Sequence, residues 1–241
     1  MAIDQNSNGY TYFFAVAMVL VVAASLSFIA TTLKPMQDTN VEQEKMQNIL
    51  SSIKIDVKRE DAAEIYGDYI TESFVVSASE RVDGVDAFSV DMLKEVRKPN
   101  TERNSPLYIA QKEGKTYYII PLQGTGLWGP IWGYISLEED MNTVYGAVFD
   151  HKAETPGLGA EINTAVFTDQ FPGKKILDDN GELLGIDVRK GGSTTAYEVD
   201  GISGGTITSD GVELMIADCL EAYIPFLKEY LNTGTTSSAD L

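Results

Sequence analysis

Residues 107–122 read LYIAQKEGKTYYIIPL, and this stretch gives the clearest indication of the architecture. Apolar and aromatic side chains fill both halves, and the polar triplet Glu113-Gly114-Lys115 separates them. Two such runs joined by a short connection that contains glycine are typical of a β-hairpin. We therefore predict two antiparallel strands that meet at this triplet.

More strands are expected on the C-terminal side of this hairpin. Residues 123–140 (QGTGLWGPIWGYISLEED) contain a glycine- and tryptophan-rich turn that leads into a strand. Residues 143–162 (TVYGAVFDHKAETPGLGAEI) begin as a strand and continue as a polar loop. Two further strands are predicted within 181–191 (GELLGIDVRKG) and 196–203 (AYEVDGIS).

The last part of the chain predicts a helix. Residues 212–231 carry a broad apolar stripe at helical spacing, which suits a helix packed on a sheet. Asp210 and Glu213 form a candidate capping pair at its start, Cys219 on the stripe is a small core residue, and Pro225 is expected to kink it. Hairpin strands followed by a terminal helix indicate an α+β fold with a mainly antiparallel sheet.

Residues 10–33 (YTYFFAVAMVLVVAASLSFIATTL) contain no charged side chain. A helix needs about 20 apolar residues to cross a bilayer, so we predict a single transmembrane helix with Tyr10 and Tyr12 at one interface. The alternative is a cleaved signal peptide, but the preceding residues lack Lys and Arg and the apolar run exceeds a usual signal. Lys34 and Lys45 follow the span, and the positive-inside rule then favours a cytoplasmic C-terminal side.

The sequence divides into six segments of different composition. They are a short tail at 1–9, the transmembrane helix at 10–33, a juxtamembrane helix at 34–58, an accessory segment at 59–105, a main domain at 106–231 and a flexible tail at 232–241. The accessory segment contains a strand candidate at 74–76, and its role is not evident from its residues.

Charge and the scarcity of metal-binding side chains exclude several functions. The chain has 18 Lys and Arg against 36 Asp and Glu, a net charge of -18, so its surface repels nucleic acid and anionic lipid. With one cysteine and one histidine, its thiolates cannot hold an iron–sulfur cluster and a His/Cys zinc site is short of ligands. We predict no metal site and no catalytic side chain, with His151 on the surface, so any redox role requires an organic cofactor.

Residues 200–211 (DGISGGTITSDG) crowd hydroxyl side chains and glycines together ahead of the predicted helix. Gly204 and Gly205 allow positive φ and close approach of another group. A helix N-terminus offers free N–H groups and partial positive charge, so a phosphate near Thr206 would be stabilised without an arginine cluster. The plain alternative is a surface turn with capping residues.

The motif D-x-x-S-G-G-T, from Asp200 to Thr206, resembles the D-x-x-[ST]-G-A-T acceptor motif of bacterial flavinylated proteins. The resemblance implies that FMN is attached through its phosphate to the Thr206 hydroxyl by a flavin transferase that uses FAD and Mg²⁺. It also implies roles in cofactor binding for Ser203, Gly204, Gly205 and Thr208. Gly205 departs from the family, which usually has Ala there, and this bears on the efficiency of modification.

Two more stretches resemble one family of such proteins, the C subunits of the bacterial Na⁺-translocating NADH:quinone reductase. They are Gly126-Leu127-Trp128-Gly129 and Glu154-Thr155-Pro156-Gly157-Leu158-Gly159. The resemblance implies that Leu127, Trp128, Glu154, Thr155 and Leu158 bind the flavin in an antiparallel-sheet FMN-binding domain. The plain alternatives are that Trp128 and Trp132 are core anchors and that the second stretch is an ordinary turn.

The family resemblance implies a single-electron relay within a six-subunit sodium pump. Its partners would be the second covalent-FMN subunit and the membrane subunits that carry iron–sulfur centres, and the isolated chain would have no turnover. The resemblance also implies a bacterial inner-membrane protein whose flavin domain is periplasmic, against the lysine count. Two alternatives remain: the homologous G subunit of the ion-translocating ferredoxin:NAD⁺ reductase, with the same covalent FMN, and a cofactor-free membrane-anchored adaptor. A secreted hydrolase is disfavoured because the chain offers no Ser-His-Asp or paired-carboxylate arrangement.

Overall fold

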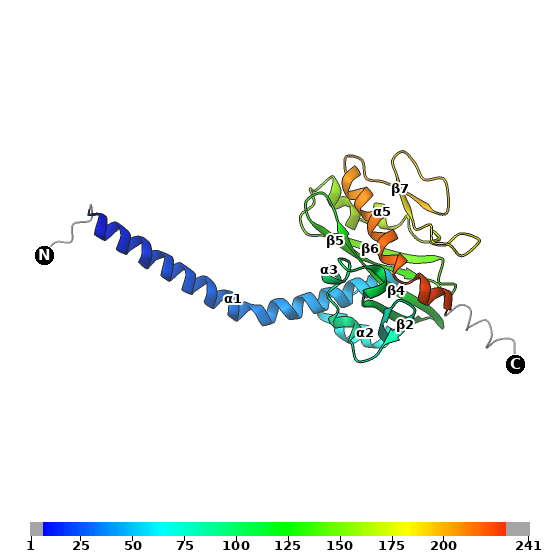
Figure 1. Cartoon of the computed structure of the whole chain (residues 1–241), viewed down its shortest axis with the longest axis horizontal. Coiled ribbons are helices and arrows are strands. Elements are labelled where there is room, and N and C mark those ends of the chain that lie inside the picture. The colour runs from blue at the N-terminus through cyan, green and yellow to red at the C-terminus, as the bar shows by residue number, and fades with distance from the viewer. Residues whose placement is uncertain (1–6, 230–241) are drawn as a thin grey trace. The chain divides into compact units, whose positions relative to one another are not determined.

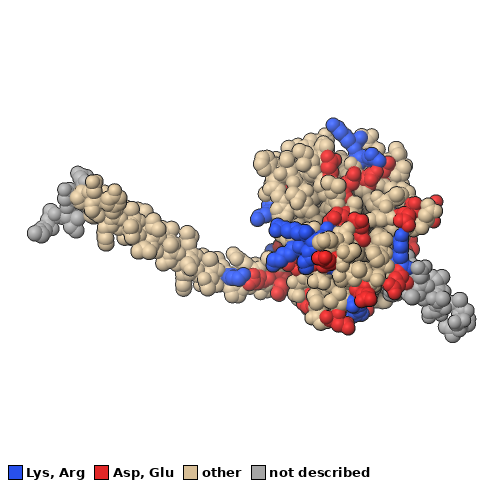
Figure 2. Space-filling model, in the orientation of Figure 1, with Lys and Arg blue, Asp and Glu red and all other residues tan. Residues whose placement is uncertain are grey.

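The computed structural model describes residues 7–229 and divides the chain into two units, Met1–Lys45 and Met46–Leu241. Helix α1 (Asn8–Ser52) runs through the boundary and contains Pro35. Its N-terminal side chains are exposed and apolar, and in Figure 2 this part of the helix is almost free of charged residues. Within residues 7–229, α1 is the one helix long and apolar enough to cross a membrane by length and composition.

The two helices expected at 10–33 and 34–58 are therefore one continuous helix, which ends at Ser52. Past the helix end, Lys54 adopts a positive φ of 59°, and the amide of Ile55 bonds back to the carbonyl of Leu50. The Lys112 ammonium donates to the carbonyls of Ile53 and Lys54 at 2.9 and 3.3 Å. These contacts turn the chain out of the helix before residue 58.

The second unit is built on a six-stranded antiparallel sheet of order β2-β1-β3-β4-β5-β6. Its strands are β1 (Ile70–Ser77), β2 (Glu80–Val82), β3 (Ser105–Lys112), β4 (Lys115–Thr125), β5 (Pro130–Leu137) and β6 (Val144–His151). Figure 1 labels its strands β2, β4, β5 and β6. The predicted hairpin is confirmed: Lys112 pairs with Lys115, and Glu113 and Gly114 have φ of 54° and 76°. Two successive positive φ values are typical of the tight turn that matches strand twist.

The segment 59–105 belongs to this sheet and is not a separate accessory. The strand candidate at 74–76 lies within β1, where Phe74 pairs with Leu107 of β3. The remaining elements of the segment are α2 (Ala62–Tyr69), α3 (Met92–Glu95) and the 3-10 helices η1 (Arg59–Asp61), η2 (Ala87–Ser89) and η3 (Asn100–Glu102). The predicted domain boundary at 106 therefore falls at the start of β3 and separates most of this strand from its partner β1.

Both faces of the sheet are covered by apolar side chains. On one face Leu107, Ile120 and Leu122 join a core with the C-terminal helix. On the other face Tyr108 and Ile119 join a core with Ile49 and Leu50. Because successive strand residues point to opposite faces, burial on both sides explains the continuous apolar run that the hairpin shows in the sequence.

The C-terminal part packs α5 (Thr206–Glu221) against β4 after a run of short elements. These are η4 (Gly159–Asn163), α4 (Ala165–Thr168), β7 (Asp187–Arg189) and β8 (Glu198–Asp200). The strands β7 and β8 pair in parallel, with Val188 opposite Val199, a local exception to the antiparallel pattern. A Cβ on Gly211 of α5 would lie 2.5 Å from the Thr125 carbonyl oxygen, so glycine lets the helix approach the strand closely.

The expected start of α5 changes, whereas its expected kink and core residue are found. The helix begins at Thr206, four residues before Asp210, and the Glu213 carboxylate accepts the Val188 amide at 2.8 Å, so Asp210 and Glu213 are not its capping pair. Helical geometry stops at Glu221 and resumes over residues 224–229. Proline lacks an N–H and clashes with the preceding turn, so this interruption agrees with the kink expected at Pro225. Cys219 is a buried core residue, and burial raises the pKa of its thiol to about 11.

Candidate functional site

Three segments that are far apart in the sequence meet in one cleft of about 410 Å³. They are the loop between β4 and β5, the loop after β6, and the start of α5. The residues that line the cleft are Leu127, Trp128, Glu154, Thr155, Leu158, Gly159, Gly204, Gly205, Thr206, Ile207 and Thr208. All candidate residues named from the sequence lie in this set except Ser203, which lines the neighbouring grooves.

The rim of the cleft is apolar and open to solvent. The side chains of Leu127, Trp128, Leu158 and Ile207 are 50%, 66%, 41% and 57% exposed. Trp128 is therefore not a core anchor. Apolar side chains gathered at an open cleft mark a surface that binds an apolar ligand or partner.

The start of α5 provides unpaired donors at the same place. Thr206 is the first helical residue and is exposed, while Gly205 before it supplies no side-chain cap. The first turn contains no acidic residue, so its backbone N–H groups and partial positive charge are available to an anion. Gly204 has a φ of 78°, and a Cβ there would lie 2.6 Å from Cδ2 of Leu158, so both backbone and space favour glycine.

Glu154 joins the three segments beneath this rim. Its side chain is buried, only 5% exposed. Oε1 accepts the backbone N–H of Trp128 at 2.8 Å, and Oε2 accepts the hydroxyl of Thr208 at 2.7 Å. One carboxylate thus connects the tryptophan loop to the first turn of α5.

Glycines make room for this carboxylate. A Cβ on Gly126 would lie 2.6 Å from Oε1 of Glu154, and a Cβ on Gly159 would lie 2.4 Å from both Oε2 and the Thr208 hydroxyl oxygen. Real Cβ atoms do not come so close, so any side chain at these positions would displace the carboxylate. Packing around the Glu154 carboxylate therefore requires glycine at Gly126 and Gly159.

Three residues of the site are not among the binding residues expected from the sequence. Ile207 and Gly159 line the cleft, and the available signal is that Gly159 ends the second loop motif and Ile207 follows Thr206. His151, expected on the surface, is half-buried at the end of β6, and its Nδ1 accepts the Glu154 backbone N–H at 3.2 Å. No pattern in the sequence pairs a histidine with a backbone amide.

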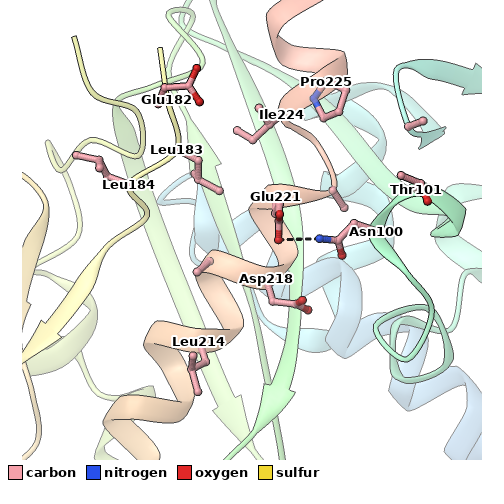
Figure 3. Close-up of a pocket in the computed structure, with 13 residues that line it drawn as sticks. Asn100, Thr101, Glu182, Leu183, Leu184, Leu214, Asp218, Glu221, Ile224 and Pro225 are labelled. Atoms are coloured by element: carbon pink, nitrogen blue, oxygen red, sulfur yellow. Dashed lines mark hydrogen bonds between the residues drawn. The ribbon is translucent and has the colours of Figure 1, made fainter. Parts of the chain in front are cut away.

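A larger hollow of about 700 Å³ runs along the outer face of α5. Figure 3 shows Leu214, Asp218 and Glu221 of the helix facing it, with Leu183 and Leu184 opposite. Three of its polar side chains have partners: Asn100 donates to Glu221 at 2.8 Å, and Glu182 pairs with Lys228, which lies outside the lining, at 2.9 Å. The groove follows the middle and end of α5, whereas the cleft contains the uncapped start of this helix, and we assign the functional site to the cleft.

Comparisons with known proteins identify the family of the domain that contains the cleft. A family model described as the FMN-binding domain matches residues 126–221, which include the cleft. The C subunit of the Na⁺-translocating NADH-quinone reductase of Vibrio campbellii is 31% identical, over 88% of this chain and 90% of its own. The corresponding protein of Neisseria meningitidis serogroup A is 31% identical, over 96% of this chain and 97% of its own.

A solved structure is similar over most of the chain. The crystal structure of the C subunit of the Na⁺-translocating NADH-quinone reductase from Parabacteroides distasonis has 46% sequence identity and a TM-score of 0.75. The similarity covers 81% of this chain and 96% of that one. The helix, antiparallel sheet and C-terminal helix described above are thus the fold of that protein family.

Proposed function

The chain belongs to the family of C subunits of the Na⁺-translocating NADH-quinone reductase, and from this we propose that it relays single electrons through FMN bound covalently to Thr206. The bond would be a phosphoester on the threonine hydroxyl. Members of this family are subunits of an oxidoreductase complex, so other subunits of that complex are partners of this chain.

The observation that carries the proposal is the convergence of three motifs on one cleft. Leu127 and Trp128, Thr155 and Leu158, and Thr206 come from separate parts of the chain and line the same hollow. Each motif is a common pattern by itself. Their meeting around an exposed threonine at a helix start supports a ligand that is apolar at one end and anionic at the other.

The residues present fit FMN. Leu127, Trp128 and Leu158 are exposed apolar side chains of the size that covers a flat aromatic ring system, and Thr155 offers a hydroxyl to its polar edge. The uncapped first turn of α5 suits a phosphate, because its N–H groups and dipole favour negative charge. When bound, the flavin supplies the ability to exchange electrons one at a time, while the protein supplies position and electrostatics.

Attachment transfers the FMN phosphoryl group from FAD to the hydroxyl of Thr206. A bond forms between Oγ1 of Thr206 and the FMN phosphorus of FAD, the phosphoanhydride bond breaks, AMP leaves and the hydroxyl proton is released. We propose that a Mg²⁺-dependent flavin transferase catalyses this step. Thr206 suits an acceptor because it is exposed at the end of a helix, where another protein reaches its hydroxyl.

We further propose that residues 10–33 cross the bacterial inner membrane and that the flavin domain is periplasmic. The electron donors and acceptors would be iron–sulfur centres in membrane subunits and the second covalent-FMN subunit. The relatives reported above are C subunits, which favours this proposal over the G subunit of the ferredoxin:NAD⁺ reductase. A cofactor-free adaptor would leave the apolar cleft and the open helix start without a use.

Mass spectrometry of the chain extracted from its native membrane tests the proposal. We expect an added mass equal to FMN less water, on the peptide that contains Thr206, and flavin fluorescence that survives denaturation. Thr206→Ala should abolish both, and the control Thr101→Ala, in the larger groove, should leave both unchanged. An unmodified wild-type chain from membranes that contain the transferase would reject covalent flavin and favour the adaptor.

A further inference from the structure

We propose that the buried carboxylate of Glu154 is a fixed negative charge that lowers the reduction potential of the flavin. This inference rests on the proposed function, because it concerns a flavin held in the cleft. It assigns to Glu154 a role beyond contact with the cofactor. The carboxylate would tune the potential and also position the loops that form the cleft.

The hydrogen bonds of Glu154 fit an ionised carboxylate. Both oxygens of Glu154 serve as acceptors, Oε1 from the Trp128 amide and Oε2 from the Thr208 hydroxyl. An ionised carboxylate is acceptor-only, whereas the protonated acid must donate from one oxygen. Two donors aimed at its two oxygens fit the ionised form, on which the proposal rests.

The position of this charge distinguishes it from the other acidic residues. Glu154 lines the cleft but is only 5% exposed. Within residues 7–229, none of the ion pairs that the structure contains involves Glu154. A buried charge without a cationic partner is screened little by salt or water, so its field reaches a ligand in the cleft more strongly than that of surface acids.

The effect on electron exchange follows from the sign of the charge. A redox partner that passes one electron to the flavin is oxidised by one electron, and the flavin gains one negative charge unless a proton follows. A nearby fixed negative charge disfavours that gain. Removing the charge should make reduction easier, so the midpoint potential should rise.

Glu154→Gln is the informative variant because it keeps the shape and an acceptor for the Trp128 amide while it removes the charge. We expect its midpoint potential, measured by potentiometric titration at fixed pH, to rise by about 59 mV, which corresponds to a tenfold change in the equilibrium of one-electron exchange. The rise should persist at high salt. An unchanged potential would overturn the proposal.

Glu95→Gln is the matched control. Glu95 is also a buried glutamate, 9% exposed, but it pairs with Lys98 at 2.7 Å and does not line the cleft. The change in net charge is the same in both variants. If the overall charge of the protein set the flavin potential, both variants would therefore show the same shift. We expect no shift in this control, and an equal shift in both would overturn the proposal.

A second variant keeps the test decisive if the glutamine variant does not fold. Thr208→Val removes the hydroxyl that partly neutralises the carboxylate. At alkaline pH, where the carboxylate keeps its charge, the potential should therefore fall below that of the wild type, and an equal or higher potential there would overturn the proposal. A folded Glu154→Gln protein without flavin would assign Glu154 to maturation and also overturn it. Mass spectrometry of the wild type separates these outcomes from failure of the proposed function. The proposed function fails only if the wild-type chain itself carries no FMN.

Discussion

The cleft at the start of α5 and the groove along its outer face share one helix but differ in how their polar groups are satisfied. In the groove, Asp218 and Glu221 are held by Arg103 and Asn100. In the cleft, the first turn of α5 has neither a cap nor an acidic side chain. The groove is the larger of the two, so volume alone would not select the site that we propose. The proposed site is distinguished by an uncapped helix start beside exposed apolar side chains.

The largest loss of stability is expected at Gly159, where the cleft has no space for a Cβ atom. Gly159→Ala would place a Cβ 2.4 Å from both Glu154 and the Thr208 hydroxyl. The displaced carboxylate would lose a hydrogen bond and strain the loop, so the free energy of unfolding should fall by about 3 kcal/mol, together with flavin incorporation. Denaturant titration and in-gel flavin fluorescence measure the two effects.

Gly129→Ala is the control for this change, because its Cβ would lie 3.9 Å from Cβ of Lys152, an ordinary contact. It belongs to the same tryptophan loop and should leave both measurements near the wild type. Equal losses in the two variants would show that the space around Glu154 does not determine stability or flavin incorporation.

An intermediate loss of stability is expected from a substitution beside the groove. Arg103 is 6% exposed and donates to the carboxylate of Asp218 and to the carbonyls of Val96 and Lys98. Arg103→Met leaves these acceptors without their donor, and the half-exposed Asp218 regains water, so we expect a loss of about 2 kcal/mol in the free energy of unfolding. Flavin content of the folded protein should not change. A variant that folds but lacks flavin would show that the two hollows are coupled.

The smallest effect on stability comes from a pair of identical substitutions. Leu214→Gln in the groove and Leu158→Gln in the cleft both change exposed side chains, 68% and 41% exposed. Each should alter the free energy of unfolding by less than about 0.5 kcal/mol. Only Leu158→Gln should shift the visible absorption of the bound flavin, because only Leu158 lines the cleft. A shift from Leu214→Gln would contradict the assignment.

The sequence predicts those features that depend on local chemistry. The turn at Glu113 and Gly114 requires positive φ, and glycine between two apolar runs indicates it directly. The same holds for the apolar helix and for the motifs that line the cleft, since each motif is visible in its own short stretch of chain. Only the meeting of these motifs requires the fold.

The errors concern contacts between distant segments. The sequence places β1 in an accessory segment, because its partner β3 lies some thirty residues further on. Glu213 has the spacing of a capping residue, but the Val188 amide takes its carboxylate and the helix starts at Thr206. Ser203 lines the grooves beside the cleft, across the positive φ of Gly204, and its role in cofactor binding stays a prediction.

The hydrogen bond from the Trp128 amide to Glu154 makes local opening of the cleft measurable by hydrogen exchange. The indole of Trp128 is 66% exposed, yet its amide is bound to a carboxylate that is 5% exposed. Such an amide exchanges its hydrogen for deuterium only when the local structure opens. Because the same carboxylate holds Thr208, the exchange rate of this one amide reports how often the tryptophan loop separates from α5.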